Sequence, residues 1–349
     1  MPQESNGRDT ATLQAVAVEA GVATSTVSRF VKGELQLAEG TERRVIQAME
    51  TLGYRRPRPA RPAAAPTDVR TIAVLVPELD SYYSRFSRLA VEAAEQVGLI
   101  PLVVSVGLTS LQAATYLRKL LAGGLEGVIS IGTLRSEEAR RLLSEHGVPL
   151  IAIDEPGGGG SIAPTHCIRV DNYSGARQVI TFLSRLGHRD IAFISGPREH
   201  AAVADRRRGY EDGMVAAGLD HTKQFDLEGV CSEDFGFAAL TSLLAFPGPR
   251  PTAVYVAADE IAAGVVNAAK HFRLTVPEEL SIVGHDDIPI ARRTVPGLTT
   301  VHTPLDAVAD AAVSALFELV AGDAVPEGAS TSVIPVTLTV RGSTAAPAT

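Results

Sequence analysis

The segment TLQAVAVEAGVATSTVSRFVKGELQLAEGTERRVIQAMETLGY, residues 12–54, decides the fold of the N-terminal part of the chain. Apolar residues recur at helical spacing as far as Ala20, and Gly21 follows where the chain must leave the helix, because glycine enters left-handed backbone conformations without a steric clash. A second helix is predicted to start near Thr24. A third is predicted to cover residues 41–52 and to bury Val45, Ile46, Met49 and Leu52. Three helices of this size enclose only a small core, so a helix-turn-helix module is predicted and not an enzyme.

The second helix of such a module is the part that reads DNA. Its start lies in the major groove, where short hydroxyl side chains and an arginine reach base edges and phosphates. Thr24, Ser25 and Arg29 are therefore the predicted readers, although the helix pattern alone would also fit a small helical bundle with a hydroxyl-rich surface. The full set of predicted DNA-contacting residues is Thr24, Ser25, Thr26, Ser28, Arg29, Tyr54, Arg58 and Arg61.

Short strings within this segment carry a family resemblance: Thr12-Leu13, Val16-Ala17, Ala20-Gly21-Val22, Thr26-Val27-Ser28-Arg29 and Leu52-Gly53-Tyr54. With them the segment resembles the headpiece of the LacI/GalR family of bacterial repressors. The resemblance implies that Thr24 and Ser25 face bases and that Arg29 contacts the operator. Ala23 departs from the family, which usually has a serine that caps the recognition helix here, and Ala15 stands where an acidic residue often completes the cap of the first helix.

Charge and length limit what the whole chain can be. Its 349 residues suffice for two or three domains, and its formal net charge is −8. Residues 1–66 hold nine Lys/Arg and seven Asp/Glu, which leaves a net charge of −10 for the remainder. The N-terminal part is therefore the part suited to a polyanion, and an acidic body would orient it toward DNA.

The sequence shows no targeting or membrane signal. The N-terminus, MPQESNGRDT, is polar, and no span approaches the roughly 20 apolar residues that cross a bilayer, so a cytoplasmic protein without membrane contact is predicted. Cys167 and Cys231 are widely separated and lack His or Cys neighbours at metal-ligand spacing. We interpret both as reduced, small apolar side chains, and we predict neither a metal nor a cofactor.

The linker, residues 55–69 (RRPRPARPAAAPTDV), is rich in Pro, Ala and Arg. The family resemblance implies a hinge helix here that inserts a leucine into the minor groove. Pro62 would interrupt that helix and Ala63 replaces the leucine, so an atypical hinge is predicted. We interpret the linker as a semi-extended arm whose arginines contact phosphates or the minor groove; a solvated spacer is the alternative.

From residue 70 onward, apolar strands alternate with amphipathic helices. Continuous apolar strands interleaved with helices predict parallel sheets covered on both faces, and the series occurs twice, so two similar α/β lobes are predicted. Ligands of such sheets bind at the carboxyl ends of the strands, which makes a cleft between the lobes the predicted site. The predicted strands include 71–77, 100–106, 127–132 and 148–154, followed by 190–196, 253–259 and 281–287.

The body also resembles LacI/GalR proteins, whose body is shared with periplasmic sugar-binding proteins. The matching strings include residues 170–176, 186–189, 206–210, 276–278, 284–288 and 298–301. The resemblance implies three crossings between the lobes, near residues 167–170, 298–302 and 326–333. The predicted domains are a headpiece (1–54), the linker (55–69) and a body (70–349), with an N-lobe of about 70–168 plus 300–327 and a C-lobe of about 169–299 plus 328–341.

The resemblance also selects effector-binding residues. Arg206 lies three residues before a Gly-aromatic pair, and Asp286 is its implied partner. A guanidinium fork and a carboxylate suit a polyol or a small polar ring, although each could instead be one half of an ion pair between the lobes. Ala258 stands where the family frequently has an asparagine, so a common hexose effector is not assumed. Further candidates are Tyr82, Tyr83 and Phe235 for stacking, Asp171, and more weakly Asp154.

These features together predict a transcriptional regulator. We expect a cytoplasmic homodimer, most simply a repressor, that binds a pseudo-palindromic operator and a small sugar-like effector. A sugar-binding transport protein is the alternative, disfavoured by the headpiece. No enzyme is predicted, because the histidines are scattered and no phosphate-binding loop or hydrolase elbow occurs.

Overall fold

The computed structural model describes residues 12–31, 35, 37–52, 70–107, 110–132, 134, 136–155, 162–198, 200–219, 226–247, 250–322 and 330–348. Contacts divide the chain into two compact units, Met1–Asp68 and Val69–Thr349. The predicted linker and Tyr54, Arg58 and Arg61 lie outside the described residues.

Within its described residues, 12–31, 35 and 37–52, the N-terminal unit contains three helices, α1 (Leu13–Ala20), α2 (Thr24–Val31) and α3 (Glu39–Thr51). The Thr12 hydroxyl caps α1 by accepting from the Ala15 amide over 3.2 Å, and Gly21 ends it with a left-handed φ of 63°. The predicted end of the first helix at Ala20 and the predicted start of the second at Thr24 are confirmed. The helices share a small core of Val16, Ala17, Ala20, Val27, Phe30, Val45, Ala48 and Met49.

One predicted core position of this unit is wrong. Ile46 was expected inside, but it is 40% exposed. Val45 and Met49, four residues apart, occupy the buried side of α3, and Ile46 follows Val45 by about 100° around the helix. Phe30, which was not predicted, fills the core from α2 instead.

The body contains two six-stranded sheets. The first has the order β11-β5-β4-β3-β1-β2 and the second the order β12-β10-β9-β8-β6-β7. The pairings are parallel except that β12 runs antiparallel to β10. The first-sheet strands are β1 (Arg70–Val76), β2 (Leu99–Ser105), β3 (Gly127–Ile131), β4 (Leu150–Ile153), β5 (His166–Val170) and β11 (Ser330–Ile334). The second-sheet strands are β6 (Ile191–Ser195), β7 (Asp226–Glu228), β8 (Ala253–Val256), β9 (Ser281–Asp286), β10 (Thr299–His302) and β12 (Thr337–Thr339).

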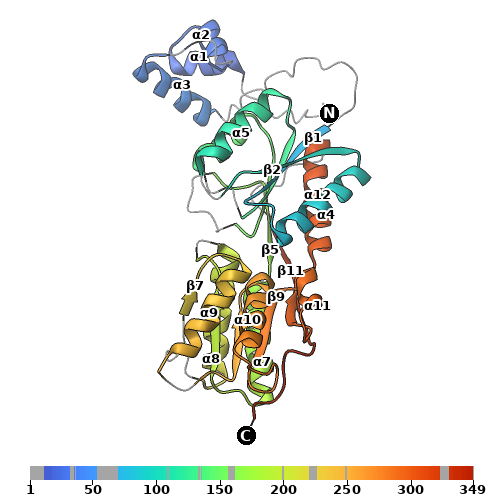
Figure 1. The fold of residues 1–349 in the computed structure, drawn as a ribbon. Coiled ribbons are helices and arrows are strands. Elements are labelled where there is room, and N and C mark those ends of the chain that lie inside the picture. Colours follow the sequence, from blue (N-terminus) through green and yellow to red (C-terminus); the bar gives the residue numbers. More distant parts are fainter. Residues whose placement is uncertain are drawn as a thin grey trace, which may run out of the picture. The chain divides into compact units, whose positions relative to one another are not determined.

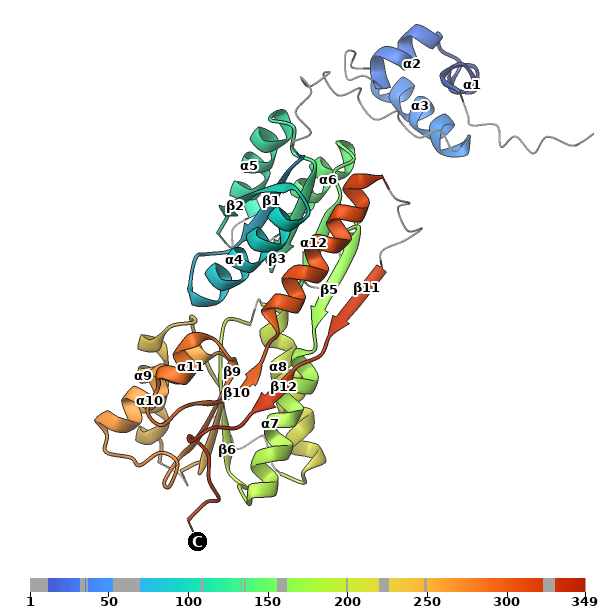
Figure 2. The same ribbon diagram turned by 90° about the vertical axis from the view of Figure 1, so that its right-hand side faces the viewer.

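Helices cover both faces of each sheet and complete two lobes (Figures 1 and 2). The first lobe carries α4 (Ser81–Gln96), α5 (Ser110–Ala122), α6 (Glu137–Glu145) and α12 (Leu305–Ala321), with α12 packed beside α4. The second lobe carries α7 (Asn172–Leu186), α8 (Ala201–Ala216), α9 (Glu233–Ala245), α10 (Asp259–His271) and α11 (Pro289–Arg293). In the part of the chain that the structure describes, none of these helices has the length and apolar character of a membrane span.

The chain crosses between the lobes three times, but later than predicted. The crossings follow β5, β10 and β11. Residues 330–334 were assigned to the second lobe, yet they pair in parallel with His166–Val170 of the first sheet, while residues 300–302 belong to the second sheet. The backbone hydrogen bonds continue to the ends of these strands, so the chain changes lobe only after each strand is complete.

The N-terminus of α10 is fixed by close packing against α9. A Cβ on Gly236 would lie 2.0 Å from the carbonyl oxygen of Ile261, and one on Gly264 would lie 1.9 Å from that of Glu233. The two helices therefore approach each other without side chains between them at these positions. This packing holds the first turn of α10, which carries Glu260, in a defined position at the end of the second sheet.

Candidate functional site

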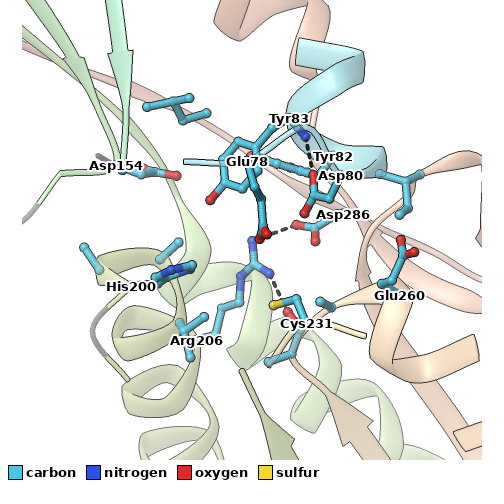
Figure 3. Close-up of a pocket in the computed structure, with 18 residues that line it drawn as sticks. Glu78, Asp80, Tyr82, Tyr83, Asp154, His200, Arg206, Cys231, Glu260 and Asp286 are labelled. Atoms are coloured by element: carbon cyan, nitrogen blue, oxygen red, sulfur yellow. Dashed lines mark hydrogen bonds and ion pairs between the residues drawn. The ribbon is translucent and has the colours of Figure 1, made fainter. Parts of the chain in front are cut away.

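A cavity of about 770 Å³, part of it open to solvent, lies between the two lobes of the body. Residues that follow β1, β3, β4, β8 and β9 line it, so it lies at the carboxyl ends of both parallel sheets. This is the position predicted from the strand pattern. Figure 3 shows its labelled residues, which come from both lobes.

Arg206 on α8 extends its guanidinium to the floor of this cavity (Figure 3). The side chain is buried and donates from Nε to Oδ1 of Asn172 over 2.8 Å, from Nη1 to the carbonyl oxygen of Ala257, and from Nη2 to Oδ1 of Asp286 over 2.7 Å. Burial alone would disfavour the charge, but the carboxylate of Asp286 keeps the pKa of Arg206 above its ordinary value. Arg206 is therefore a fixed cation at the cavity floor.

Asp286 ends β9 and is held in an unusual backbone conformation, with a φ of 103°. Burial raises the pKa of its carboxyl, and the Arg206 charge limits the rise. Arg206 and Asp286 both belong to the second lobe. The ion pair of 2.7 Å between them therefore forms within the second lobe, and each residue has its charged partner there and not across the lobes.

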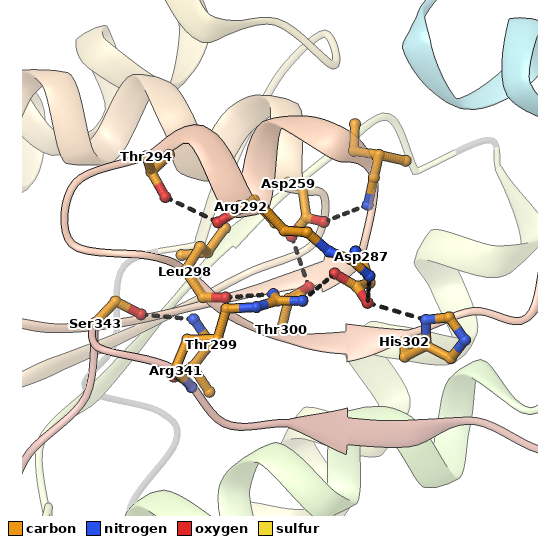
Figure 4. Close-up of polar contacts among 12 residues, drawn as sticks. Asp259, Asp287, Arg292, Thr294, Leu298, Thr299, Thr300, His302, Arg341 and Ser343 are labelled. Atoms are coloured by element: carbon orange, nitrogen blue, oxygen red, sulfur yellow. Dashed lines mark hydrogen bonds and ion pairs between the residues drawn. The ribbon is translucent and has the colours of Figure 1, made fainter.

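The next residue, Asp287, holds the end of β9 in place through contacts with Arg341 and His302 (Figure 4). Its carboxylate accepts from Arg341 over 2.5 Å and contacts Nδ1 of His302 at 3.0 Å. Asp287 also has a positive φ, 52°. The adjacent acids thus have different tasks: Asp286 faces the cavity, and Asp287 holds the backbone that presents it.

A hydrogen-bonded chain links the two lobes beside the cavity. Asp154, at the end of β4, accepts from the amide of Val170 over 2.8 Å and from Nδ2 of Asn172 over 3.2 Å. Asn172 in turn accepts from Arg206. Burial raises the pKa of Asp154 to about 6, although these hydrogen bonds and Arg206 oppose the rise. Asp154, a weaker candidate in the sequence, therefore lines the cavity and connects to Arg206 through one amide.

Tyr82 and Tyr83 in the first turn of α4 also line the cavity. Their rings meet edge to face, with centroids 5.2 Å apart. Burial raises the pKa of both hydroxyls, so both remain neutral. The pair provides an aromatic wall from the first lobe opposite Arg206 of the second, and the stacking of a ligand on it stays a prediction.

Two predicted effector residues do not line the cavity. Phe235 packs on the second core, and its ring would lie 2.4 Å from a Cβ at Gly229. Asp171 caps α7 by accepting from the Ser174 amide over 3.1 Å. Both predictions are corrected, because one side chain serves packing and the other satisfies a helix end.

Several cavity residues were not predicted from the sequence. Glu78 and Asp80 follow β1, Glu260 lies in the first turn of α10, and Cys231 and His200 also line the cavity. Burial raises the pKa of Asp80 to about 6, and the nearby carboxylates of Glu78, Glu260 and Asp286 add to the rise. In the described ranges no three His, Cys, Asp or Glu side chains are arranged to hold a metal ion. The sequence signal that could have identified these residues as cavity residues was their position shortly after predicted strands.

In the N-terminal unit, α2 exposes the predicted reading residues. Thr24, Ser25 and Arg29 are exposed, and Thr26 and Ser28 are half-buried beside the buried Val27. The amides of Thr26 and Val27 donate to the carbonyl oxygen of Ala23, whose side chain has no acceptor to offer. The helix thus has one apolar face toward the core and one polar face toward solvent.

Comparison with known proteins identifies the family to which a chain with this headpiece and this body belongs. A family model described as bacterial regulatory proteins, lacI family, matches residues 12–57, and one described as a periplasmic binding protein-like domain matches residues 180–344. A curated relative, HTH-type transcriptional regulator reg1 of Streptomyces lividans, is 30% identical over 358 residues, which cover 96% of this chain and 97% of the relative. The chain belongs to the LacI family.

Solved structures of similar proteins share this architecture. The transcriptional regulator CelR in complex with cellobiose is 27% identical, with a TM-score of 0.71, and the match covers 95% of this chain and 99% of that one. The lac repressor dimer bound to operator and the anti-inducer ONPF is 26% identical, with a TM-score of 0.71, over 97% and 100% of the two chains. This LacI-family chain is accordingly a DNA-binding transcriptional regulator with a ligand-binding body.

Proposed function

We propose that this LacI-family regulator is a cytoplasmic repressor without enzymatic activity. A homodimer binds a pseudo-palindromic operator, and a small polar, sugar-like effector in the cavity between the lobes changes the affinity for that operator. The observation that carries the proposal is the buried Arg206–Asp286 pair at the floor of a cavity whose walls come from two lobes. A ligand that contacts both lobes binds one relative placement of the lobes better than another, and so shifts their equilibrium.

The chemistry of the cavity supports a polyhydroxylated effector. Arg206 provides N–H donors and Asp286 and Asp154 provide carboxylate acceptors, which together suit adjacent hydroxyl groups. Tyr82 and Tyr83 provide aromatic surface for the apolar face of a ring. CelR, a similar protein, is solved with cellobiose bound. Ala258 lines the cavity without a polar group, which argues for an effector distinct from those that an asparagine at this position would bind.

The surface of the first lobe supports a homodimer. β2 is an edge strand of the first sheet, and it exposes 46% of Ile100, 39% of Leu102 and 38% of Val103. An exposed apolar edge strand is a liability for a monomer and is usually covered by a partner. The lac repressor, to which this chain is similar, is solved as a dimer on its operator. Two headpieces in a dimer would read the two halves of a pseudo-palindrome.

The proposed DNA contacts are those of α2. Thr24 and Ser25 stand at its exposed N-terminal end and Arg29 on its exposed face, so base contact by the first two and base or phosphate contact by Arg29 are proposed. Thr26 and Ser28 are proposed to contribute at the margin of the same surface. Tyr54, Arg58 and Arg61 remain predictions outside the described residues.

The function is tested by selecting DNA duplexes from a random pool with the full-length chain. We expect enrichment of a pseudo-palindrome, and binding of it that weakens roughly tenfold or more in Arg29→Ala. Arg293→Ala, an exposed arginine of the body, is the matched control and should bind like the parent chain. Enrichment of no sequence, or equal binding by both variants, would contradict the proposal.

A further inference from the structure

We propose that the effector is a small polyhydroxylated compound that carries a protonated amino group, held among Glu78, Asp80 and Glu260. The inference rests on the proposed function, since it names the chemical class of the ligand of the same cavity.

The cavity is strongly acidic. Five carboxylates line it, those of Glu78, Asp80, Asp154, Glu260 and Asp286, against one arginine. Arg206 is already engaged by Asp286 and by two neutral acceptors. The described residues provide no Lys or Arg partner within ion-pair distance for Glu78, Asp80 or Glu260. Glu78 is exposed, whereas Asp80 and Glu260 are half-buried. A neutral sugar that displaces water from Asp80 and Glu260 would leave these two carboxylates without a counterion.

The excess charge is gathered in one part of the cavity. Figure 3 shows Asp80, Glu260 and Asp286 on one side of the Arg206 guanidinium, and Asp154 and His200 on the other. The pKa of Asp80 rises first through burial and then through the negative charges of Glu78, Glu260 and Asp286, which shows that these groups act on one another. The name acidic corner is used below for Glu78, Asp80 and Glu260.

The acidic corner contains residues from both lobes. Glu78 and Asp80 follow β1 of the first lobe, whereas Glu260 lies on α10 of the second. Their mutual repulsion opposes closure of the lobes, and a cation between them would convert that repulsion into attraction. An ammonium group in the corner would therefore favour the closed placement of the lobes, which is the property that an effector needs.

An organic ammonium fits the corner better than a metal ion. Among the described residues no three acidic, His or Cys side chains converge as metal ligands. An ammonium group needs no such convergence, because one or two charge-assisted hydrogen bonds to carboxylates suffice to hold it. Arg206, Asp286 and the Tyr82–Tyr83 pair remain for the hydroxyl groups and the ring.

The test uses matched ligands on the full-length chain. Glucose, galactose and mannose are each compared with the corresponding 2-amino-2-deoxy sugar and its N-acetyl derivative in thermal unfolding at pH 7. We expect at least one amino sugar to raise the melting temperature, with an affinity about tenfold or more above those of its neutral and acetylated partners. Equal or larger shifts with the neutral sugars, or no shift with any amino sugar, would overturn the inference. Neither result would affect operator selection, so the proposed function would stand.

Variants of the corner supply a second readout. Glu260→Gln should raise the melting temperature of the unliganded chain by about a degree or two and should lower the affinity for the amino sugar about tenfold. Glu278→Gln, an exposed glutamate of the same lobe, is the matched control and should change neither value. A preference for the amine that survives Glu260→Gln together with Asp80→Asn would equally overturn the inference.

Discussion

Nη2 of Arg206 donates to Oδ1 of Asp286 over 2.7 Å, and the two residues are 80 positions apart on α8 and β9 of the same lobe. Both side chains are less than one tenth exposed. The pair gives the cavity a floor of paired charge. Because both side chains are buried, removal of either residue would leave the other as an unpaired buried charge.

Arg206→Ala is expected to leave Asp286 as a buried, unpaired carboxylate. Loss of one partner of a buried ion pair costs roughly 3–5 kcal/mol, so the free energy of unfolding of the body should fall by about that amount. Urea denaturation of the full chain measures it. Arg208→Ala, an exposed neighbour on α8 that contacts Asp205, should cost under about 1 kcal/mol. A loss equal in both variants would mean that the buried pair has no special role.

Asp80 is expected to make stability depend on pH. Its pKa in the folded protein is raised from 3.8 to about 6, mainly by burial. The folded protein therefore binds more protons than the unfolded chain between these pH values, and stability falls as the pH rises from about 4 to about 6. Asp80 also caps α4 by accepting from the Tyr83 amide over 2.7 Å. Asparagine can keep this cap, so Asp80→Asn should flatten the fall by about 1 kcal/mol after allowance for solvent screening.

The comparison for Asp80→Asn is thermal unfolding at several pH values, with Glu95→Gln as an exposed acid of the same helix. The control should follow the parent chain. An unchanged slope in Asp80→Asn would show that this carboxyl titrates near its ordinary pKa.

Removal of the cap of α1 is expected to destabilise the headpiece, and addition of a cap to α2 is expected to stabilise it. Thr12 caps α1 through its hydroxyl, whereas Ala23 offers α2 only a carbonyl oxygen. Thr12→Ala should destabilise the headpiece and Ala23→Ser should stabilise it, each by about 1 kcal/mol. Amide hydrogen exchange of α1 and α2 in the full chain should change by roughly fivefold in each case. Slower exchange in Thr12→Ala, or faster exchange in Ala23→Ser, would refute the assignment of the caps.

The edge strand β2 is expected to carry part of the dimer interface. Leu102→Asp places a charge on its exposed apolar surface and should shift sedimentation of the chain toward the monomer. Val333→Asp, on the opposite edge strand β11 and 59% exposed, is the matched control and should leave the sedimentation unchanged. Dissociation by the control alone would move the proposed interface to the other edge of the sheet.

The sequence predicted those features that depend on local periodicity or on short motifs. The C-terminal end of α1 was predicted from apolar spacing and from Gly21, because a glycine with positive φ marks a helix end whatever surrounds it. The two parallel sheets were predicted because a strand buried on both faces is apolar throughout. Arg206 and Asp286 were predicted from family motifs, and both line the cavity.

The errors arose where neighbours in space decide the role of a residue. Phe235 was expected to stack on a ligand, but Gly229 leaves room for its ring within the lobe. Asp171 was expected near the effector, but its carboxylate satisfies the start of α7. The third crossing was placed too early, because the pairing of β11 with β5 is a long-range contact that leaves no local signal.

By itself the sequence determined the class of the protein: a helix-turn-helix headpiece followed by two α/β lobes, because helix and strand periods and cap residues act over a few positions. Only the tertiary structure decided the character of the cavity. Glu78 and Asp80 are about 180 positions from Glu260, and they share a cavity because the carboxyl ends of two separate sheets face each other. The surplus of negative charge there is a property of that juxtaposition, since Coulomb interactions depend on distance in space and not along the chain.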